Sequence, residues 1–349
     1  MSMPRRSGPA AVIAGLGSWV PPRVVDNAEL ASRWDITDEW IRTRTGIHRR
    51  RVVDPGVSTV DLAVEAGGRA VKSAQSGDRG AGPPGESAIG AVVLATTTPD
   101  RPCPASAPEV ASRLGLVGVA AMDVAAVCTG FLYGLATGAG LISVGVAEQV
   151  LVIGADTFST ILDPDDHTTG AIFGDGAGAV VLRAGHPDEP GGLGPFDLGS
   201  DGDGAELIMI PGGGSRQRSR DGRHADADHY FRMNGRPVFR RAVAQMAASA
   251  RLALDRVGWD LSDVDRFVGH QANARILRAV GENLGLAPEQ IVSNIDSVGN
   301  TAAASIPLAL ADASRSGQIE AGHRVLLSAF GGGITWGSTT LVWPAVTAV

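Results

Sequence analysis

The sequence predicts an α/β layered fold made of two similar halves. Short β-branched runs alternate with alanine-rich helical stretches, which is typical of layered α/β proteins. The 349 residues match about two domains at roughly 150 residues each. The order helix, buried strand, Phe-Gly-rich turn, buried strand occurs once in each half. We therefore expect a duplicated unit, divided into residues 1–185 and 186–349, with a site at the junction of its halves.

The individual elements follow from the hydrophobic period and the local composition. Runs of β-branched and other apolar residues predict buried strands at 89–95, 150–154, 179–182, 266–269, 324–327 and 338–342. Apolar residues at helical spacing predict helices at 239–257, 273–284 and 302–313. Stretches rich in glycine, proline or charged residues predict inserted surface loops at 76–87 and 212–228.

Two apolar stretches look like targeting or membrane segments, and we assign both to the core. Residues 10–14 follow two arginines, as in a signal peptide, but the stretch is short and interrupted by glycines, which favours a first core strand. Residues 124–147 are uncharged over a length that could span a membrane. They are rich in glycine and flanked by Asp123 and Glu148 rather than by cations, so we expect a buried helix.

The glycine-rich run at 173–178 raises the question of nucleotide binding. A dinucleotide-binding fingerprint needs a strand before the glycines and a helix after them. Here the predicted strand 179–182 follows the glycines, so no helix N-terminus lies beneath a pyrophosphate. We therefore reject a nucleotide role and expect these glycines to permit a tight turn and close backbone packing.

Composition and charge exclude several classes of protein. Hydrophobic residues make up 44% and charged residues 19% of the chain, which excludes general disorder. The net charge of −7 argues against nucleic acid or an anionic membrane as the main partner. The two cysteines, Cys103 and Cys128, cannot form a disulfide framework or a four-cysteine zinc site. We expect a cytoplasmic protein without a bound metal.

Three residues carry the predicted chemistry. Cys128 begins the long apolar helix, where the helix dipole and unpaired amides are expected to lower its pKa and favour the thiolate. His270 follows the strand 266–269, and Asn300 precedes the helix 302–313. Taken singly, each residue has an ordinary structural role: a core cysteine, a hydrogen-bonding histidine, and a helix N-cap. The phrases around them are what indicate catalysis.

These phrases closely resemble ketoacyl-acyl-carrier-protein synthase III of the thiolase superfamily. They occur in the family's order from about residue 12 to residue 342, and the intervals are 270 − 128 = 142 and 300 − 270 = 30 residues. The matching phrases are Asp38-Glu-Trp-Ile41, Arg44-Thr-Gly46, the context of Cys128, Phe173-Gly-Asp-Gly-Ala-Gly178, His270-Gln-Ala-Asn273, Gly299-Asn-Thr301, Phe330-Gly-Gly-Gly333 and Thr335-Trp-Gly337. The resemblance implies the duplicated, five-layered thiolase fold (αβαβα) and a homodimer.

The resemblance also implies a reaction. Cys128 would take a short acyl group from acyl-CoA, with the backbone amides of Cys128 and Gly332 as oxyanion hole. Malonyl-acyl carrier protein would then lose carbon dioxide, and His270 and Asn300 would hold the enolate oxygen. The carbanion would attack the acyl group and give a 3-ketoacyl-acyl carrier protein. No metal or nicotinamide takes part, and coenzyme A enters only as a thioester substrate.

Binding roles are implied for further residues. Trp40, Arg44, His167 and Asn273 match CoA-binding positions, Asn273 also supporting the active-site hydrogen bonds. At 167 a histidine stands where housekeeping enzymes usually have an arginine. The implied acyl-pocket residues are Cys103, Phe158 and Phe173, and the implied carrier-docking residues are Arg240, Arg275 and Arg278.

Some departures from the family pattern leave other functions open. Cys103 replaces a larger residue that would reach across the dimer, which predicts a roomier acyl pocket, and Glu282 lies among positions that are often basic. Both departures, with His167, suit a starter-unit synthase or an acyltransferase of polyketide assembly that acts without decarboxylation. A papain-like hydrolase would need a different setting around Cys128. A non-catalytic binding module is disfavoured by the intact triad.

Overall fold

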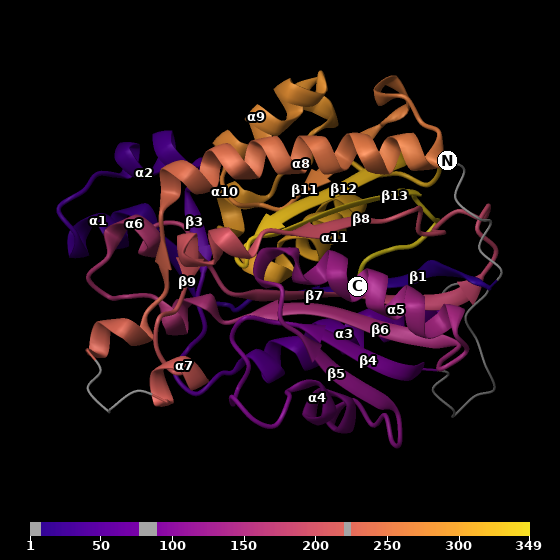
Figure 1. The fold of residues 1–349 in the computed structure, drawn as a ribbon, viewed down its shortest axis with the longest axis horizontal. Coiled ribbons are helices and arrows are strands. Elements are labelled where there is room, and N and C mark those ends of the chain that lie inside the picture. The colour runs from indigo at the N-terminus through magenta and orange to yellow at the C-terminus, as the bar shows by residue number, and fades with distance from the viewer. Residues whose placement is uncertain (1–7, 77–88, 220–224) are drawn as a thin grey trace.

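Five alternating layers of helix and sheet make up the computed structural model, which describes residues 8–76, 89–219 and 225–349 (Figure 1). From one outer face to the other, the layers are a helix pair, a five-stranded sheet, two central helices, a four-stranded sheet and a second helix pair. The predicted loop at 76–87 falls almost wholly outside the described residues.

The first sheet has the strand order β1-β7-β6-β4-β5. Strands β4, β5 and β6 run parallel, and β7 pairs antiparallel with both β6 and β1. Its strands are β1 (Ala10–Trp19), β4 (Ile89–Ala95), β5 (Ala120–Val124), β6 (Gln149–Asp156) and β7 (Gly176–Gly185). Helices α3 (Thr59–Ser76) and α4 (Ala107–Arg113) cover its outer face. The stretch at 10–14 is thus a core strand, as predicted.

The second sheet has the strand order β11-β12-β13-β8. Strands β11 and β12 are parallel, whereas β13 pairs antiparallel with β12 and β8. Its strands are β8 (Asp197–Ser200), β11 (Arg266–Gly269), β12 (Arg324–Gly331) and β13 (Thr335–Val342). Helices α8 (Gly235–Val257) and α9 (Ala274–Leu284) pack together on its outer face.

Helices α5 (Gly130–Ser143) and α11 (Ser305–Ser316) form the layer between the sheets. The largest apolar cluster of the described chain packs around them, and it includes Phe131, Leu132 and Leu310, all essentially buried. The uncharged stretch at 124–147 is therefore core, as predicted. Within the described ranges, no helix combines the length and hydropathy needed to cross a bilayer.

The two halves repeat one arrangement of the backbone. Strand order 1-7-6-4 of the first sheet corresponds to 8-13-12-11 of the second. Each central helix follows a short 3-10 helix, η1 (Val127–Thr129) or η7 (Ala302–Ala304), whose first residue has a φ of 47°. Val127 and Ala302 are 302 − 127 = 175 residues apart. This confirms the repeat read from the sequence.

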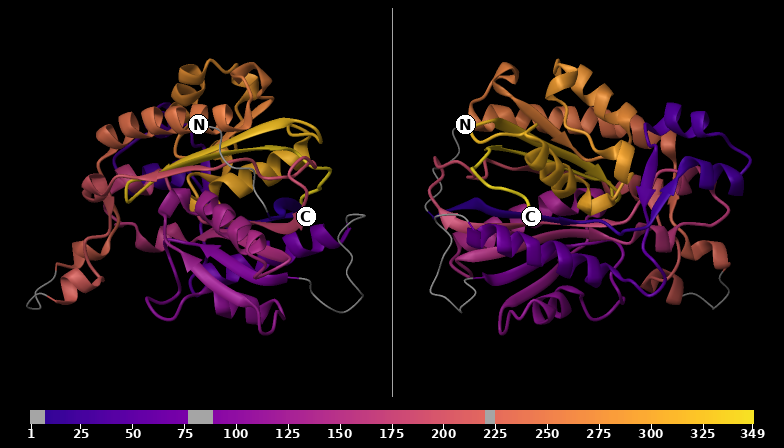
Figure 2. Two further views of the ribbon diagram at one scale, coloured as in Figure 1. Left: turned by 45° about the vertical axis from the view of Figure 1, so that its right-hand side comes forward. Right: turned by 180° about the vertical axis from the view of Figure 1, so that it is seen from behind.

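Smaller elements connect these layers, and α1, α2, α6 and α7 lie beside one end of them (Figures 1 and 2). The helices are α1 (Asn27–Arg33), α2 (Asp38–Thr45), α6 (His167–Gly170), α7 (Ser215–Arg218) and α10 (Ile295–Val298). The strands are β2 (Val24–Asp26), β3 (Arg49–Arg51), β9 (Ile208–Met209) and β10 (Arg232–Met233). Further 3-10 helices are η2 (Phe158–Ile161), η3 (Gly202–Leu207), η4 (Asp226–His229), η5 (Leu261–Asp263) and η6 (Pro288–Gln290).

The glycine-rich run at 173–178 leads into β7 and not into a helix, which agrees with the rejected nucleotide role. A Cβ on Gly174 would lie 2.3 Å from the carbonyl oxygen of Val298, so only glycine permits this approach. Asp175 is buried and accepts hydrogen bonds from Val53 N (2.8 Å) and from Ser159 N (2.8 Å) and Oγ (2.6 Å). The turn therefore holds the segment after β3 and the segment after β6 together.

Candidate active site

The thiol of Cys128 lies in η1, immediately before α5, and is 8% exposed. The preceding Val127 has a φ of 47°, a left-handed conformation that few β-branched residues adopt. A Cβ on Gly331, at the end of β12, would lie 2.9 Å from Cys128 N. Glycine at 331 therefore keeps the space in front of the Cys128 amide clear.

The predicted lowering of the Cys128 pKa is wrong in direction. Burial, and to a lesser extent the carboxylate of Asp156, raise the pKa of this thiol above its ordinary value. Sequence inspection located the helix start correctly but could not show how deeply the thiol lies beneath apolar side chains. The thiol is accordingly neutral near pH 7.

A chain of threonines fixes the turn that carries Gly332. Thr335 Oγ1 donates to Gly332 O (3.0 Å) and lies 2.5 Å from Thr129 Oγ1. Thr129 Oγ1 in turn donates to the carbonyl of Ala126 (2.6 Å), two residues before Cys128. A Cβ on Gly332 would lie 3.2 Å from the Val127 side chain. Gly332 and the nucleophile's loop are thus held next to each other, and the threonines were missed from the sequence.

His270 follows β11 and is buried, with its backbone N–H bonded to Ser328 O (2.8 Å). Its ring Nδ1 lies 2.6 Å from Ser305 Oγ, at the start of α11, and Gln271 N donates to the same hydroxyl (3.4 Å). Because Nδ1 is occupied, Nε2 is the ring atom left for a substrate. Burial lowers the pKa of His270 to about 3, so the ring is neutral near pH 7.

Asn300 precedes η7 and is buried on the loop that faces the glycine-rich turn. Its Oδ1 accepts from Ala302 N (2.9 Å), and its Nδ2 donates to Ala272 O (3.4 Å), two residues beyond His270. Its backbone pairs with Phe173, through Ile172 O and Gly174 N. The amide is therefore oriented by fixed neighbours, with one Nδ2 hydrogen to spare.

Asp156, at the end of β6, connects the cysteine half to the asparagine half. Its Oδ1 accepts from Thr97 N (2.7 Å) and from Thr98 N (3.2 Å), and its Oδ2 accepts from Ala303 N (3.0 Å). Burial raises its pKa to about 6, partly offset by these hydrogen bonds. No motif in the sequence marks this residue, because its partners are up to 147 positions away.

An apolar cluster adjoins the thiol. Phe158 and Phe173 stack at 4.1 Å, and both meet the edge of Phe231, at 4.9 and 5.2 Å. Cys128 belongs to the same buried cluster. Phe231 was missed, because it follows the segment read as an inserted loop. Cys103 lies instead on an exposed loop outside this cluster, so a pocket role for it requires a second chain.

Three of the four residues matched to CoA binding lie together. The rings of Trp40 and His167 meet edge to face at 5.4 Å, and the Arg44 guanidinium lies 4.5 Å above Trp40. Asn273 is the N-cap of α9, where its Oδ1 accepts from Ile276 N (2.9 Å). That oxygen thus serves the helix rather than the hydrogen-bond network of His270 and Asn300.

The predicted docking arginines are exposed on neighbouring helices. Arg240 lies on α8, and Arg275 and Arg278 lie on α9, where Arg275 reaches over Phe239. Glu282 is exposed on the same helix. Among the residues with a described placement, no three His, Cys, Asp or Glu side chains are grouped so as to hold a metal ion.

Comparison with known proteins gives a consistent family. Residues 122–202 match the model of 3-oxoacyl-[acyl-carrier-protein] synthase III, and residues 254–343 match that of its C-terminal part. Beta-ketoacyl-[acyl-carrier-protein] synthase III 5 of Streptomyces coelicolor is 58% identical over 97% of this chain and 99% of its own.

Solved structures extend this similarity to the fold. The crystal structure of 3-oxoacyl-(acyl carrier protein) synthase III from Pseudomonas aeruginosa superposes with a TM-score of 0.88 at 49% identity, covering 97% of this chain and 99% of that one. A priming β-ketosynthase of a polyketide biosynthetic pathway superposes with a TM-score of 0.87 at 32% identity, covering 98% of each chain.

Proposed function

The chain belongs to the 3-oxoacyl-[acyl-carrier-protein] synthase III family, and from this premise we propose how its residues divide the condensing reaction. The observation that carries the assignment is the position of the Cys128 thiol at the start of α5. There it adjoins an apolar cluster on one side and the loop of Asn300 on the other. The reaction has two halves, acyl loading and decarboxylative condensation.

In the loading half, Cys128 attacks the carbonyl carbon of a short acyl-CoA. The new S–C bond replaces the bond to CoA sulfur, and the thiol proton leaves with the departing CoA thiol. The backbone amides of Cys128 and Gly332 stabilise the tetrahedral oxyanion. Support comes from Gly331, which leaves the Cys128 amide accessible, and from Thr335, which fixes the Gly332 peptide.

In the condensing half, the malonyl group of a carrier-bound thioester loses carbon dioxide. His270 Nε2–H and Asn300 Nδ2–H donate to the thioester oxygen as it becomes an enolate. The neutral ring of His270 suits donation, since Ser305 occupies the other nitrogen. The resulting carbanion attacks the acyl carbonyl on Cys128, the S–C bond breaks, and the 3-ketoacyl thioester leaves; the expelled Cys128 thiolate then takes a proton from water.

Substrate and partner contacts complete the proposal. Trp40, Arg44 and His167 clasp the adenine end of CoA, while the stacked rings of Phe158 and Phe173 line the acyl pocket. The exposed arginines 240, 275 and 278 bind the acidic carrier protein. We assign residues 1–185 and 186–349 to the two repeated halves of each chain. Two such chains form a homodimer in the cytoplasm, and the reaction needs no metal or nicotinamide.

Mass spectrometry of the protein and of its proteolytic peptides, after incubation with acyl-CoAs, tests the loading step. The wild type should gain one acyl mass on the peptide that contains Cys128, and Cys128→Ala should gain none. Cys103→Ala is the matched control, because it removes the other, exposed cysteine and should load normally. Acylation of Cys103 instead of Cys128 would contradict the assignment.

A second candidate is the priming of a polyketide, or acyl transfer without decarboxylation. The superposition with a priming β-ketosynthase and the small Cys103 favour it. Release of labelled carbon dioxide from malonyl-acyl carrier protein, together with a 3-ketoacyl product, supports condensation. Acyl transfer with the carboxylate retained would support the second candidate.

A further inference from the structure

A cavity rich in arginine lies apart from the proposed active site. It has a volume of about 440 Å³ and is lined by residues from the end of β1, from β3, α3, α10 and α11. Four lining residues are arginines: 49, 51, 69 and 315. Of the described residues that line it, Asp312 alone has a side-chain carboxylate. Positive charge is thus concentrated here on a chain whose net charge is −7.

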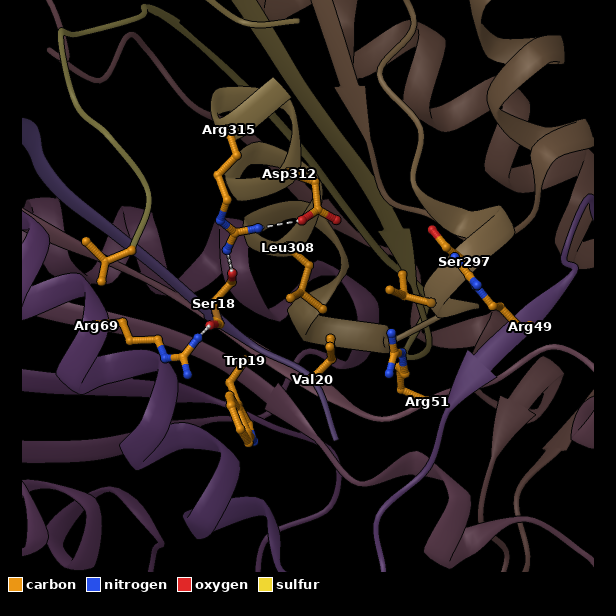
Figure 3. A pocket seen from close by; sticks show the side chains of 12 residues that line it. Ser18, Trp19, Val20, Arg49, Arg51, Arg69, Ser297, Leu308, Asp312 and Arg315 are labelled. Atoms are coloured by element: carbon orange, nitrogen blue, oxygen red, sulfur yellow. Dashed lines mark hydrogen bonds and ion pairs between the residues drawn. The ribbon is translucent and has the colours of Figure 1, made fainter. Parts of the chain in front are cut away.

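One side of the cavity is rigidly built (Figure 3). Arg315 pairs with Asp312 (2.7 Å) and also donates to the Ser18 hydroxyl. Arg69 donates to Ser18 O (3.2 Å), and its guanidinium lies 4.6 Å over the ring of Trp19. Both cations are therefore held in position before any ligand arrives, which lowers the entropic cost of binding.

The opposite side presents two arginines whose charge is not neutralised. Arg49 and Arg51 alternate on β3, so both face the cavity, while the intervening Arg50 points into the interior. Neither forms a salt bridge with any described residue, in contrast to Arg69 and Arg315. Arg51 donates from Nη1 to Pro22 O (3.1 Å), but its buried Nε has no hydrogen-bond partner there.

A buried donor without a partner destabilises the folded chain, so Arg51 Nε indicates a missing acceptor. Guanidinium groups match phosphate oxygens in paired, charge-assisted hydrogen bonds. Several of them around one cavity suit a multiply charged anion better than a single carboxylate. The volume lies at the small end of ligand pockets, which run from about 300 to 1,000 Å³.

We propose that this cavity is a binding site for a small phosphate-bearing anion, held by Arg49 and Arg51 against the fixed cations Arg69 and Arg315. The apolar side chains of Val20, Val298 and Leu308 line the remaining wall and leave room for a short organic group. The site shares no residue with the cluster of Trp40, Arg44 and His167. It is therefore distinct from the proposed CoA site.

Calorimetric titration with inorganic pyrophosphate, in chloride buffer at fixed ionic strength, tests the proposal. The wild type should bind one pyrophosphate per chain, and Arg49→Ala/Arg51→Ala should weaken binding at least about tenfold. The matched control is Arg101→Ala/Arg113→Ala, which removes two exposed arginines near α4 and should bind as the wild type does. An equal loss in both double variants, or no saturable binding, overturns the proposal.

Two further variants separate the alternatives. Asp312→Asn removes a carboxylate that repels an anion and should tighten pyrophosphate binding. This variant tests the site even if Arg49→Ala/Arg51→Ala does not fold. Arg44→Ala removes an arginine of the proposed CoA-adenine site and should leave the affinity for pyrophosphate unchanged. Loss of binding in Arg44→Ala would place the pyrophosphate at the CoA site and refute the proposal. Malonate should bind more weakly than pyrophosphate; equal affinity would refute the phosphate preference.

Discussion

Replacement of Ser305 by alanine tests whether one hydroxyl sets the protonation of the catalytic histidine. Ser305 Oγ lies 2.6 Å from His270 Nδ1 and accepts the backbone N–H of Gln271. The proposed mechanism needs the tautomer in which the Ser305 hydroxyl donates to Nδ1 and the single ring proton lies on Nε2. Alanine removes only the oxygen, so the ring loses its fixed tautomer and its orientation.

The size of the effect follows from burial. His270 is 2% exposed, so water does not readily replace the missing partner. A buried acceptor left unpaired costs about 1–3 kcal/mol. Since 1.36 kcal/mol corresponds to a factor of ten, we expect the condensation rate to fall about 10- to 100-fold. Acyl loading should be nearly unchanged, because its oxyanion is held by the backbone.

Two single-turnover measurements check this expectation. Release of CoA on mixing with acyl-CoA reports loading, and release of carbon dioxide from malonyl-acyl carrier protein by the acylated enzyme reports condensation. Ser249→Ala, which removes another buried hydroxyl on α8, is the control for a general loss of stability. An equal fall in both half-reactions, or a condensation rate like that of the wild type, would refute the tautomer argument.

Four other outcomes are expected. His270→Ala and Asn300→Ala should each lower condensation about 10²- to 10³-fold while loading persists, measured by carbon dioxide and CoA release; equal losses would reassign the roles. Because the Cys128 pKa is raised and the thiol proton leaves with the CoA thiol, loading kcat/KM should stay level between about pH 6 and 8; a rise of about tenfold per pH unit would contradict reaction from the neutral thiol. Since the His270 pKa falls from 6.5 to about 3 on folding, stability is lost as pH drops below 6.5. Between pH 7 and pH 5 the free energy of unfolding, measured with urea, should fall by about 2 kcal/mol more in the wild type than in His270→Ala. Equal falls in the two proteins would contradict the pKa shift of His270. Phe231→Ala should lower the free energy of unfolding by about 3–5 kcal/mol and shift the loading preference from acetyl- toward butyryl-CoA. Cys103→Phe should shift the preference toward acetyl-CoA in a dimer. If neither preference changes, neither residue lines the acyl pocket.

The sheet strands, and the elements that carry the candidate catalytic residues, were predictable because their signals are local. The β-branched run at 89–95 coincides with β4, and 266–269 with β11, which delivers His270. The edge strand β5 was missed, since Ala120-Ala-Met-Asp-Val124 lacks a buried apolar run; all five residues are only half-buried.

The supporting contacts were not predictable because they join distant segments. Ser305 reaches His270 across 35 positions, and Asp156 reaches Ala303 across 147. No period or motif in the sequence marks such pairs. The direction of the Cys128 pKa failed for the same reason, since burial beneath Phe158, Phe173 and Phe231 outweighs the local effect of the helix start.

The duplication has left one chain with two copies of the same turn, and the copies have diverged in task. Counting 175 residues on from Cys128 leads to Ala303, which occupies the same place in η7 that the nucleophile occupies in η1. The backbone N–H of Ala303 donates a hydrogen bond to the Asp156 carboxylate, whereas Gly331 keeps the N–H of Cys128 accessible. The second copy therefore serves as the scaffold that fastens its sister turn. A thiol placed at 303 would not produce a second reaction centre, because the backbone N–H of residue 303 is already bonded to Asp156 and cannot stabilise an oxyanion.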